Sequence, residues 1–124
     1  MQIQVNTDNH IEGSEELTRE VESIVEGTLG RFVDWITRVE VQLSDEDGPK
    51  NHRNAKRCEM EARPEGHQPL SVSHQGTTMD QALKGCVKKL ERLLNDTKER
   101  LYDLKGNISF AGEQTSELNP RGED

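Results

Sequence analysis

The chain is poor in aromatic residues and in cysteine. One Trp, one Tyr and two Phe occur among its 124 residues, so a hydrophobic core has to be built mainly from Leu, Val and Ile. Its two cysteines, Cys58 and Cys86, are too few for the disulfide framework that stabilises small secreted domains. Both fall at apolar positions of expected elements, and we predict two buried free thiols.

Long hydrophobic runs are also missing. No stretch approaches the roughly 18–20 apolar residues that a membrane-spanning helix requires. The chain opens Met-Gln-Ile-Gln-Val, with neither the basic start nor the apolar core of a secretory signal. These absences lead us to expect a cytoplasmic protein that does not interact with membranes. Because 124 residues suffice for one ordinary domain and not for two, we expect a single domain.

Charge is abundant and unevenly divided. The net charge is −8, from 24 acidic and 16 basic residues. Residues 1–47 hold twelve acids and three bases, and residues 106–124 hold four acids and one base. Residues 48–105 instead hold twelve bases and eight acids. A basic segment inside an acidic chain indicates an anionic partner, of which nucleic acid is the commonest.

The first part of the chain predicts a strand, a helix and a second strand. Residues 2–6 alternate polar and apolar side chains, as a half-buried strand does. Ser14 followed by two glutamates is typical of a helix N-terminus, where a hydroxyl caps free N–H groups and acids face the positive end of the dipole. Apolar residues at helical spacing continue to Phe32, although two glycines weaken the last turns. Residues 36–44 alternate again.

Two more strands and a long helix follow a turn-rich loop that starts at Asp45. Residues 56–63 alternate, with Cys58 on the apolar side and charged residues on the other, and residues 70–74 form the next strand. His74 continues the apolar side of that strand, which favours a buried, hydrogen-bonded histidine. Thr77 or Thr78 then caps a helix that starts at residue 79.

These elements predict an α+β fold in the order β-α-β-β-β-α. The first two strands, joined by a helix, should be parallel, and the later pairs antiparallel. Each strand has one apolar face, so we expect a four-stranded mixed sheet with both helices on one face. From Gly106 onward periodicity is lost, which predicts a domain over residues 1–105 and a disordered acidic tail over residues 106–124.

The long helix is apolar on one side and largely basic elsewhere. Its apolar residues recur at a spacing of three and four: Met79, Leu83, Cys86, Val87, Leu90, Leu93, Leu94 and Leu101. Its basic residues are Lys84, Lys88, Lys89, Arg92, Lys98 and Arg100. The alternative interpretation is a solvated helix whose lysines only maintain solubility.

The chain resembles the family of ribosome hibernation factors. That family comprises hibernation-promoting factor, ribosome-associated inhibitor A and the sigma-54 modulation, S30EA-like proteins. The similarity covers roughly residues 2–104 and is strongest in residues 87–94, Val-Lys-Lys-Leu-Glu-Arg-Leu-Leu, which match the family's signature in the last helix. Residues 9–17, Asn-His-Ile-Glu-Gly-Ser-Glu-Glu-Leu, and the order of elements agree as well.

The resemblance implies a fold similar to a double-stranded-RNA-binding domain. It also implies binding to the small ribosomal subunit, in the channel for messenger and transfer RNA, and inhibition of translation during stress. The matching positions are Lys88, Lys89 and Arg92, which the resemblance assigns to rRNA contacts. Lys84, Lys98 and Arg100 lie on the same predicted helix and are included as further contacts. Longer members dimerise ribosomes through an additional domain, and we expect no dedicated dimerisation domain in this protein.

One departure from the family leaves a second function open. The family's first helix commonly carries Lys and Arg, whereas residues 15–26 here hold five glutamates and only Arg19. A protein-interaction module of the same fold, which uses its acidic first helix and no longer binds ribosomes, is therefore the alternative. Nonspecific binding of structured RNA is a third possibility.

A second basic cluster spans the end of the turn-rich loop and the start of the strand predicted over residues 56–63. It consists of Lys50, His52, Arg53, Lys56 and Arg57. This cluster either extends the basic surface of the last helix, which would make its Lys and Arg residues RNA contacts, or keeps an edge strand soluble.

Metal binding and catalysis have little support in the sequence. The scattered residues His52, Cys58, His67, His74 and Cys86 lack the paired spacing of a structural zinc site. The acids at 45–47 lack the alternating ligands and distal Glu of a calcium loop. No nucleophile has an adjacent base, and no phosphate-binding glycine loop occurs. We therefore expect no enzyme activity, no metal or other cofactor and no small-molecule substrate.

Overall fold

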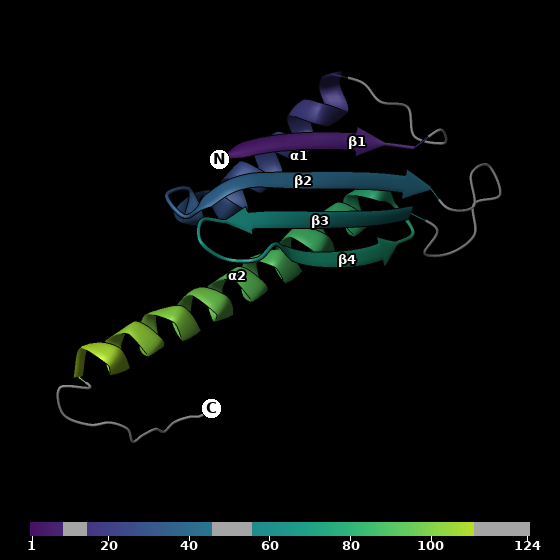
Figure 1. Cartoon of the computed structure of the whole chain (residues 1–124). Coiled ribbons are helices and arrows are strands. Elements are labelled where there is room, and N and C mark those ends of the chain that lie inside the picture. Colours follow the sequence, from purple (N-terminus) through teal and green to yellow (C-terminus); the bar gives the residue numbers. More distant parts are fainter. Residues whose placement is uncertain (9–14, 46–55, 111–124) are drawn as a thin grey trace. The chain divides into compact units, whose positions relative to one another are not determined.

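The computed structural model describes residues 1–8, 15–45 and 56–110, with the backbone alone for residues 104–110. Along the chain its elements are β1 (Gln2–Thr7), α1 (Glu15–Leu29), the short 3-10 helix η1 (Gly30–Phe32), β2 (Ile36–Asp45), β3 (Lys56–Pro64), β4 (Leu70–Gly76) and α2 (Met79–Phe110) (Figure 1). The predicted order β-α-β-β-β-α and the α+β class are confirmed.

The four strands form one mixed sheet in the order β1-β2-β3-β4. β1 and β2 are parallel, with Val5 opposite Val41, and α1 supplies the crossover that a parallel pair requires. β3 is antiparallel to both β2 and β4. α1 and the first turns of α2 lie on the same face of the sheet (Figure 1), so neither of the described helices covers the opposite face, as predicted.

The core lies between the covered sheet face and the two helices. From the sheet it receives Val39, Val41, Leu43, Cys58, Met60 and Ala62, all fully buried. From the helices it receives Val21, Val25, Leu29, Ala82, Leu83, Cys86, Val87 and Leu90. Burial of this aliphatic surface, at about 25 cal/mol per Å², is the main source of stability, and it explains why so few aromatic residues suffice.

The two cysteines are free and buried, as the sequence predicts. They come from β3 and α2, and the Cys86 thiol donates to the backbone oxygen of Cys58 at 3.3 Å. The hydrogen bond with Cys86, followed by burial, holds the pKa of the Cys58 thiol well above its usual range. A thiol kept protonated is a poor nucleophile and a poor metal ligand, so the pair serves packing.

His74 differs from its prediction as a buried, hydrogen-bonded residue. It is only half-buried, and its ring lies against Gly85 of α2, where an added Cβ would come 2.7 Å from His74 Cγ. β4 is an edge strand that α2 covers only in part, which is why His74 keeps access to solvent.

The end of α2 also differs from the prediction. The helix continues to Phe110, so residues 106–110 are helical although their composition assigned them to the tail. An existing helix propagates at little cost per residue, and Gly106 alone costs about 1 kcal/mol. Residues 1–92 form one compact unit, and the part of the chain from residue 93 forms a second. The rest of the predicted tail, residues 111–124, lies outside the described residues.

Candidate nucleic-acid interface

The basic helix α2 starts at a well-formed cap. Thr78 Oγ1 accepts a hydrogen bond from the backbone N–H of Gln81 at 3.1 Å, and the Gln81 side chain accepts one from the backbone N–H of Thr77 at 3.1 Å. The first of these bonds satisfies an N–H group that the first turn leaves without a helical partner, and the second joins that turn to the residue before the cap. Of the two predicted caps, Thr78 is the one in the structure, and it fixes where the helix begins.

Three cations form a row along the exposed side of α2. Lys84, Lys88 and Arg92 follow one another at a spacing of four residues, and all three are exposed. Successive members are therefore about 6 Å apart along the helix axis. We call these three residues the α2 row.

The α2 row is only weakly neutralised within the protein. Lys84 pairs with Asp80 at 3.3 Å, with both side chains more than half exposed. Within the described residues, neither Lys88 nor Arg92 has an ion-pair partner. Like charges four residues apart destabilise a helix by about 0.2–0.5 kcal/mol per pair, so the α2 row costs stability that an anionic partner would recover.

Lys89 lies outside the α2 row. Its ammonium group donates to the backbone oxygen of Ser73 at 3.0 Å, on the edge strand β4. Lys89 is nevertheless exposed, so its charge adds to the positive potential beside the row while one of its donors is already engaged.

The second predicted cluster is divided by the structure. Lys56 pairs with the nearly buried carboxylate of Asp45 at 2.7 Å, and Arg57 pairs with Glu59 at 2.9 Å. Lys50 and Arg53 lie outside the described residues. The two members that are described are therefore engaged by acids, and Lys56 is as much a structural residue as a candidate contact.

Two further candidates lie beyond the first compact unit. Lys98 and Arg100 are on the part of α2 that follows Arg92, and both are exposed. The helix therefore presents cations to solvent in both of its parts.

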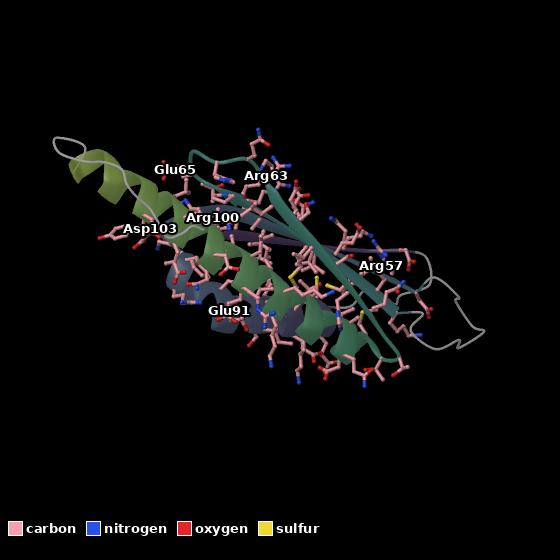
Figure 2. All side chains as sticks on the ribbon, turned by 90° about the horizontal axis from the view of Figure 1, so that it is seen from below. Arg57, Arg63, Glu65, Glu91, Arg100 and Asp103 are labelled. Carbon is pink, nitrogen blue, oxygen red and sulfur yellow. The ribbon has the colours of Figure 1, made fainter. Side chains whose placement is uncertain are left out.

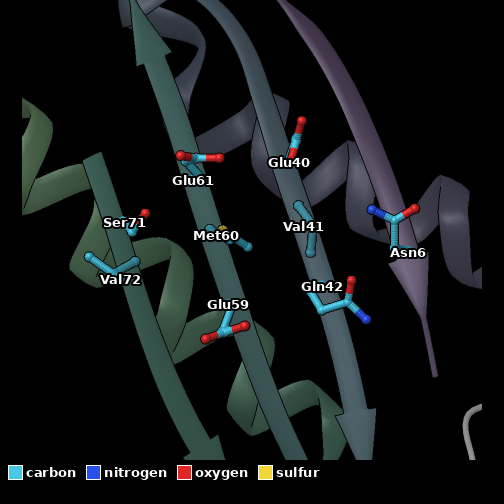
Figure 3. Close-up of a pocket in the computed structure, with 9 residues that line it drawn as sticks. All are labelled: Asn6, Glu40, Val41, Gln42, Glu59, Met60, Glu61, Ser71 and Val72. Carbon is cyan, nitrogen blue, oxygen red and sulfur yellow. The ribbon is translucent and has the colours of Figure 1, made fainter. Parts of the chain in front are cut away.

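The open face of the sheet is acidic at its centre. Glu40, Glu59 and Glu61 surround a shallow hollow of about 260 Å³ (Figure 3). The arginines on this face pair with those acids: Arg63 lies 3.6 Å from Glu61. Arg57 and Arg63 lie towards opposite ends of β3 (Figure 2). Since its cations are balanced locally, this face is a weaker site for a polyanion than α2.

The acidic face of α1 is as predicted from the sequence. Glu15, Glu16, Glu20 and Glu26 are exposed and Glu22 is half-buried. No cation in the described part of the chain pairs with them. α1 and α2 thus carry opposite charge on their outer sides.

Sequence reasoning did not find the groove between these two helices. It is lined by Ile24 and Gly27 of α1 and by Val87 and Lys88 of α2, among others, and holds about 770 Å³. The only signal in the sequence was Gly27, a glycine inside a helical pattern.

Neither metal ligands nor a membrane span is found in the described ranges. Across residues 1–8, 15–45 and 56–110, no group of three or more His, Cys, Asp or Glu side chains gathers to hold a metal ion. Of the helices that the structure describes, none has the length and apolar character to cross a bilayer.

Comparison with known proteins places the chain in a family. The structure resembles the N-terminal domain of Thermus thermophilus Protein Y, with a TM-score of 0.64, 20% identity, and coverage of 78% of this chain and 99% of that one. It also resembles a ribosomal subunit interface protein from Coxiella burnetii, with a TM-score of 0.62, 18% identity, and coverage of 80% and 99%. At these identities the likeness shows a shared fold.

No curated protein matches the chain. Residues 3–102, however, match the sequence profile of one family, and this match confirms the family resemblance seen in the sequence. The chain belongs to the family described as Sigma 54 modulation protein / S30EA ribosomal protein.

Proposed function

We propose that this protein is a ribosome-associated translation inhibitor that binds the small ribosomal subunit and its rRNA. Its site would be the channel for messenger and transfer RNA, and its role would be hibernation of ribosomes under stress in the cytoplasm. The function is non-catalytic and requires neither a cofactor nor a small-molecule substrate. Family membership supports association with the ribosome, and one of the similar structures is titled a ribosomal subunit interface protein.

The α2 row is the observation that carries this proposal. A rigid helix with three exposed cations about 6 Å apart can pair with successive phosphates of a folded RNA. Such contacts position a protein without reading bases, which suits recognition of rRNA by shape. The row persists in a chain of net charge −8, where general solubility requires no basic surface.

The remaining basic residues are proposed to contribute to RNA binding to different extents. Lys89 supplies charge beside the row, and Lys98 and Arg100 extend the basic helix. Arg57 at the start of β3, together with Lys50 and Arg53 before it in the chain, adds contacts. Lys56 contributes chiefly by neutralising Asp45.

A charge-reversal experiment tests the proposal. The variant with Lys88→Glu, Lys89→Glu and Arg92→Glu should no longer co-sediment with the small subunit through a sucrose gradient, at low or near-physiological salt. These side chains are exposed, so the fold should persist, which circular dichroism verifies. Retained co-sedimentation by the folded triple variant would refute the site.

A single-site control distinguishes the effect of a residue's position from the effect of net charge. Arg19→Glu makes the same charge change as Lys88→Glu, also on an exposed helix surface, but on α1. The α1 variant should co-sediment like the wild type, whereas Lys88→Glu should reduce binding severalfold. Equal losses in both variants would indicate an effect of net charge alone.

The acidic face of α1 favours one alternative function. If the chain instead docks a basic protein through α1, charge reversal at Glu22 and Glu26 should abolish that association while the α2 triple variant retains it. The paired variants therefore assign the working surface to one helix or the other.

A further inference from the structure

A groove lies between α1 and α2 and is lined by residues of these two helices. Its volume of about 770 Å³ lies within the range of ligand sites. Ile24 and Val87 supply its aliphatic floor, and Lys84 and Lys88 stand along the α2 side. All of its lining residues belong to the first compact unit.

Gly27 has no internal reason to be a glycine. It lies within α1, where glycine is about 1 kcal/mol less favourable than alanine. A Cβ added there would meet no atom within 4 Å, in contrast to Gly85, where an added Cβ would strike His74. Glycine at position 27 thus makes α1 less stable than alanine would, and it leaves open space in the groove.

The charge that lines the groove is positive and comes from α2, while exposed Glu20 lies one turn before Ser23 and Ile24 on the same side of α1. The α1 side offers the uncharged Ser23, Gly27 and Thr28. On the α2 side, the Lys84 charge is shared with exposed Asp80, and Lys88 has no ionic partner within the described residues. Glu91, at the far end, is neutralised by Arg31 at 3.5 Å.

We propose that this groove docks a peptide segment of a protein partner, with aliphatic side chains flanked by carboxylates. The aliphatic side chains would rest on Ile24 and Val87 over Gly27, and the carboxylates would pair with Lys84 and Lys88. The inference goes beyond ribosome binding and does not depend on it.

The lining favours a peptide over a nucleic acid. Bases are bound by stacking on aromatic side chains, and the groove has none. Aliphatic side chains seated between two helices are the usual anchors of peptide recognition. Because Lys84 and Lys88 also belong to the α2 row, a docked acidic peptide would compete with RNA for the same ammonium groups.

Filling the groove tests the inference. The probe is a fluorescein-labelled peptide, Gly-Glu-Glu-Leu-Leu-Glu-Glu-Gly, titrated with the full chain and followed by fluorescence anisotropy. Gly27→Leu should weaken binding at least tenfold, because the new side chain occupies the space that the peptide needs. Leucine is a better helix former than glycine, so the variant should fold with an unchanged or higher melting temperature.

Matched controls distinguish binding in the groove from nonspecific hydrophobic or electrostatic binding of the probe. Glu26→Leu adds the same side chain one residue away on α1, outside the groove lining, and should bind the probe at least as well as the wild type. Probes with serines in place of the leucines, or lysines in place of the glutamates, should bind at least tenfold more weakly. Equal binding of these probes, or unchanged affinity in Gly27→Leu, would overturn the inference.

Two further outcomes would assign the groove to another occupant and likewise overturn it. One is loss of ribosome co-sedimentation in Gly27→Leu, which would make the groove part of the RNA surface. The other is concentration-dependent self-association, seen by sedimentation velocity in the wild type and lost in Gly27→Leu. If the wild type fails to bind ribosomes at all, the peptide titration is unaffected, so the two proposals fail separately.

Discussion

Lys56 lies in a basic segment, but its main contribution is to the stability of the fold. Its ammonium group lies 2.7 Å from an oxygen of Asp45, whose side chain is 8% exposed. The backbone N–H of Asp45 also donates to the carboxylate of Asp8 at 3.2 Å, so Lys56 is the cation of a site that contains two acids. A nearly buried carboxylate without a cation is costly.

Lys56→Met should therefore destabilise the protein by about 1–3 kcal/mol, since the methionine keeps the aliphatic stem but leaves Asp45 without its partner. Urea denaturation at pH 7 measures this loss. Lys84→Met, which removes the exposed pair with Asp80, should change stability by less than about 1 kcal/mol. Equal effects in the two variants would show that burial of the Asp45 pair contributes nothing.

The Cys58 thiol gives a pH dependence of stability with a defined sign. Its pKa is raised in the folded protein, first by the hydrogen bond with Cys86 and then by burial, from an ordinary value of 9.0. Below pH 9 the thiol is protonated in both the folded and the unfolded chain, and its contribution is complete. Above pH 9 only the unfolded chain ionises, so stability falls as pH rises, with a slope that approaches about 1.4 kcal/mol per pH unit.

Cys58→Ala should flatten that slope. Urea denaturation at pH 8, 9 and 10 should show the wild type losing about 1 kcal/mol more between pH 9 and pH 10 than the variant does. The other side chains are common to both proteins, so their contributions cancel in the comparison. Parallel pH profiles would mean that the folded protein tolerates a thiolate at Cys58.

At the scale of elements, two glycines in two helices have opposite roles. Gly85 lets α2 approach β4 closely, because its missing Cβ leaves room for the His74 ring. Gly27 faces open space. The same substitution should consequently have opposite effects at the two positions.

Gly85→Ala should destabilise the protein by about 1–3 kcal/mol, as overpacking does, and Gly27→Ala should stabilise it by up to about 1 kcal/mol. Thermal and urea unfolding of both variants measures the difference. His74→Ala combined with Gly85→Ala should recover part of the loss, because the clash is with that ring. A stabilising Gly85→Ala would show that α2 shifts outward without cost.

Local pattern in the sequence was sufficient to predict most elements. Alternation located the inward residues of β2 and β3, and the threonines before residue 79 located the α2 cap, because these signals depend only on side-chain period and hydrogen bonding. Composition placed the end of α2 too early, since helix propagation tolerates a few unfavourable residues.

Features made by packing between elements could not be predicted in the same way. The pairing of Lys56 with Asp45 joins two strands across the β2–β3 ladder. The groove depends on the separation of α1 and α2, which no residue spacing encodes. The sequence identified all three residues of the α2 row as basic candidates, but it did not show that Lys89 lies apart from them. That distinction required the position of Ser73 on β4, whose backbone oxygen binds the Lys89 ammonium group.

At the scale of the whole molecule, the charge distribution sets the conditions for RNA binding. The chain carries −8 overall, which opposes approach to a polyanion, while the α2 row offers three local cations. Contacts with phosphates release bound counterions, so affinity falls with salt by a log–log slope of about −0.7 to −0.9 per contact. The three contacts of the α2 row alone imply a slope of about −2 to −3, and contacts from the other proposed residues make it steeper.

Ribosome affinity should therefore drop at least about 20-fold between 50 and 200 mM salt. Arg92→Gln should reduce the slope by nearly one, because one phosphate contact is removed, while Arg19→Gln on α1 should leave it unchanged. Titration of small subunits at four salt concentrations measures both slopes. If Arg92→Gln keeps the wild-type slope, the α2 row does not contact phosphate. If Glu26→Gln changes the slope instead, the acidic face of α1 binds the partner.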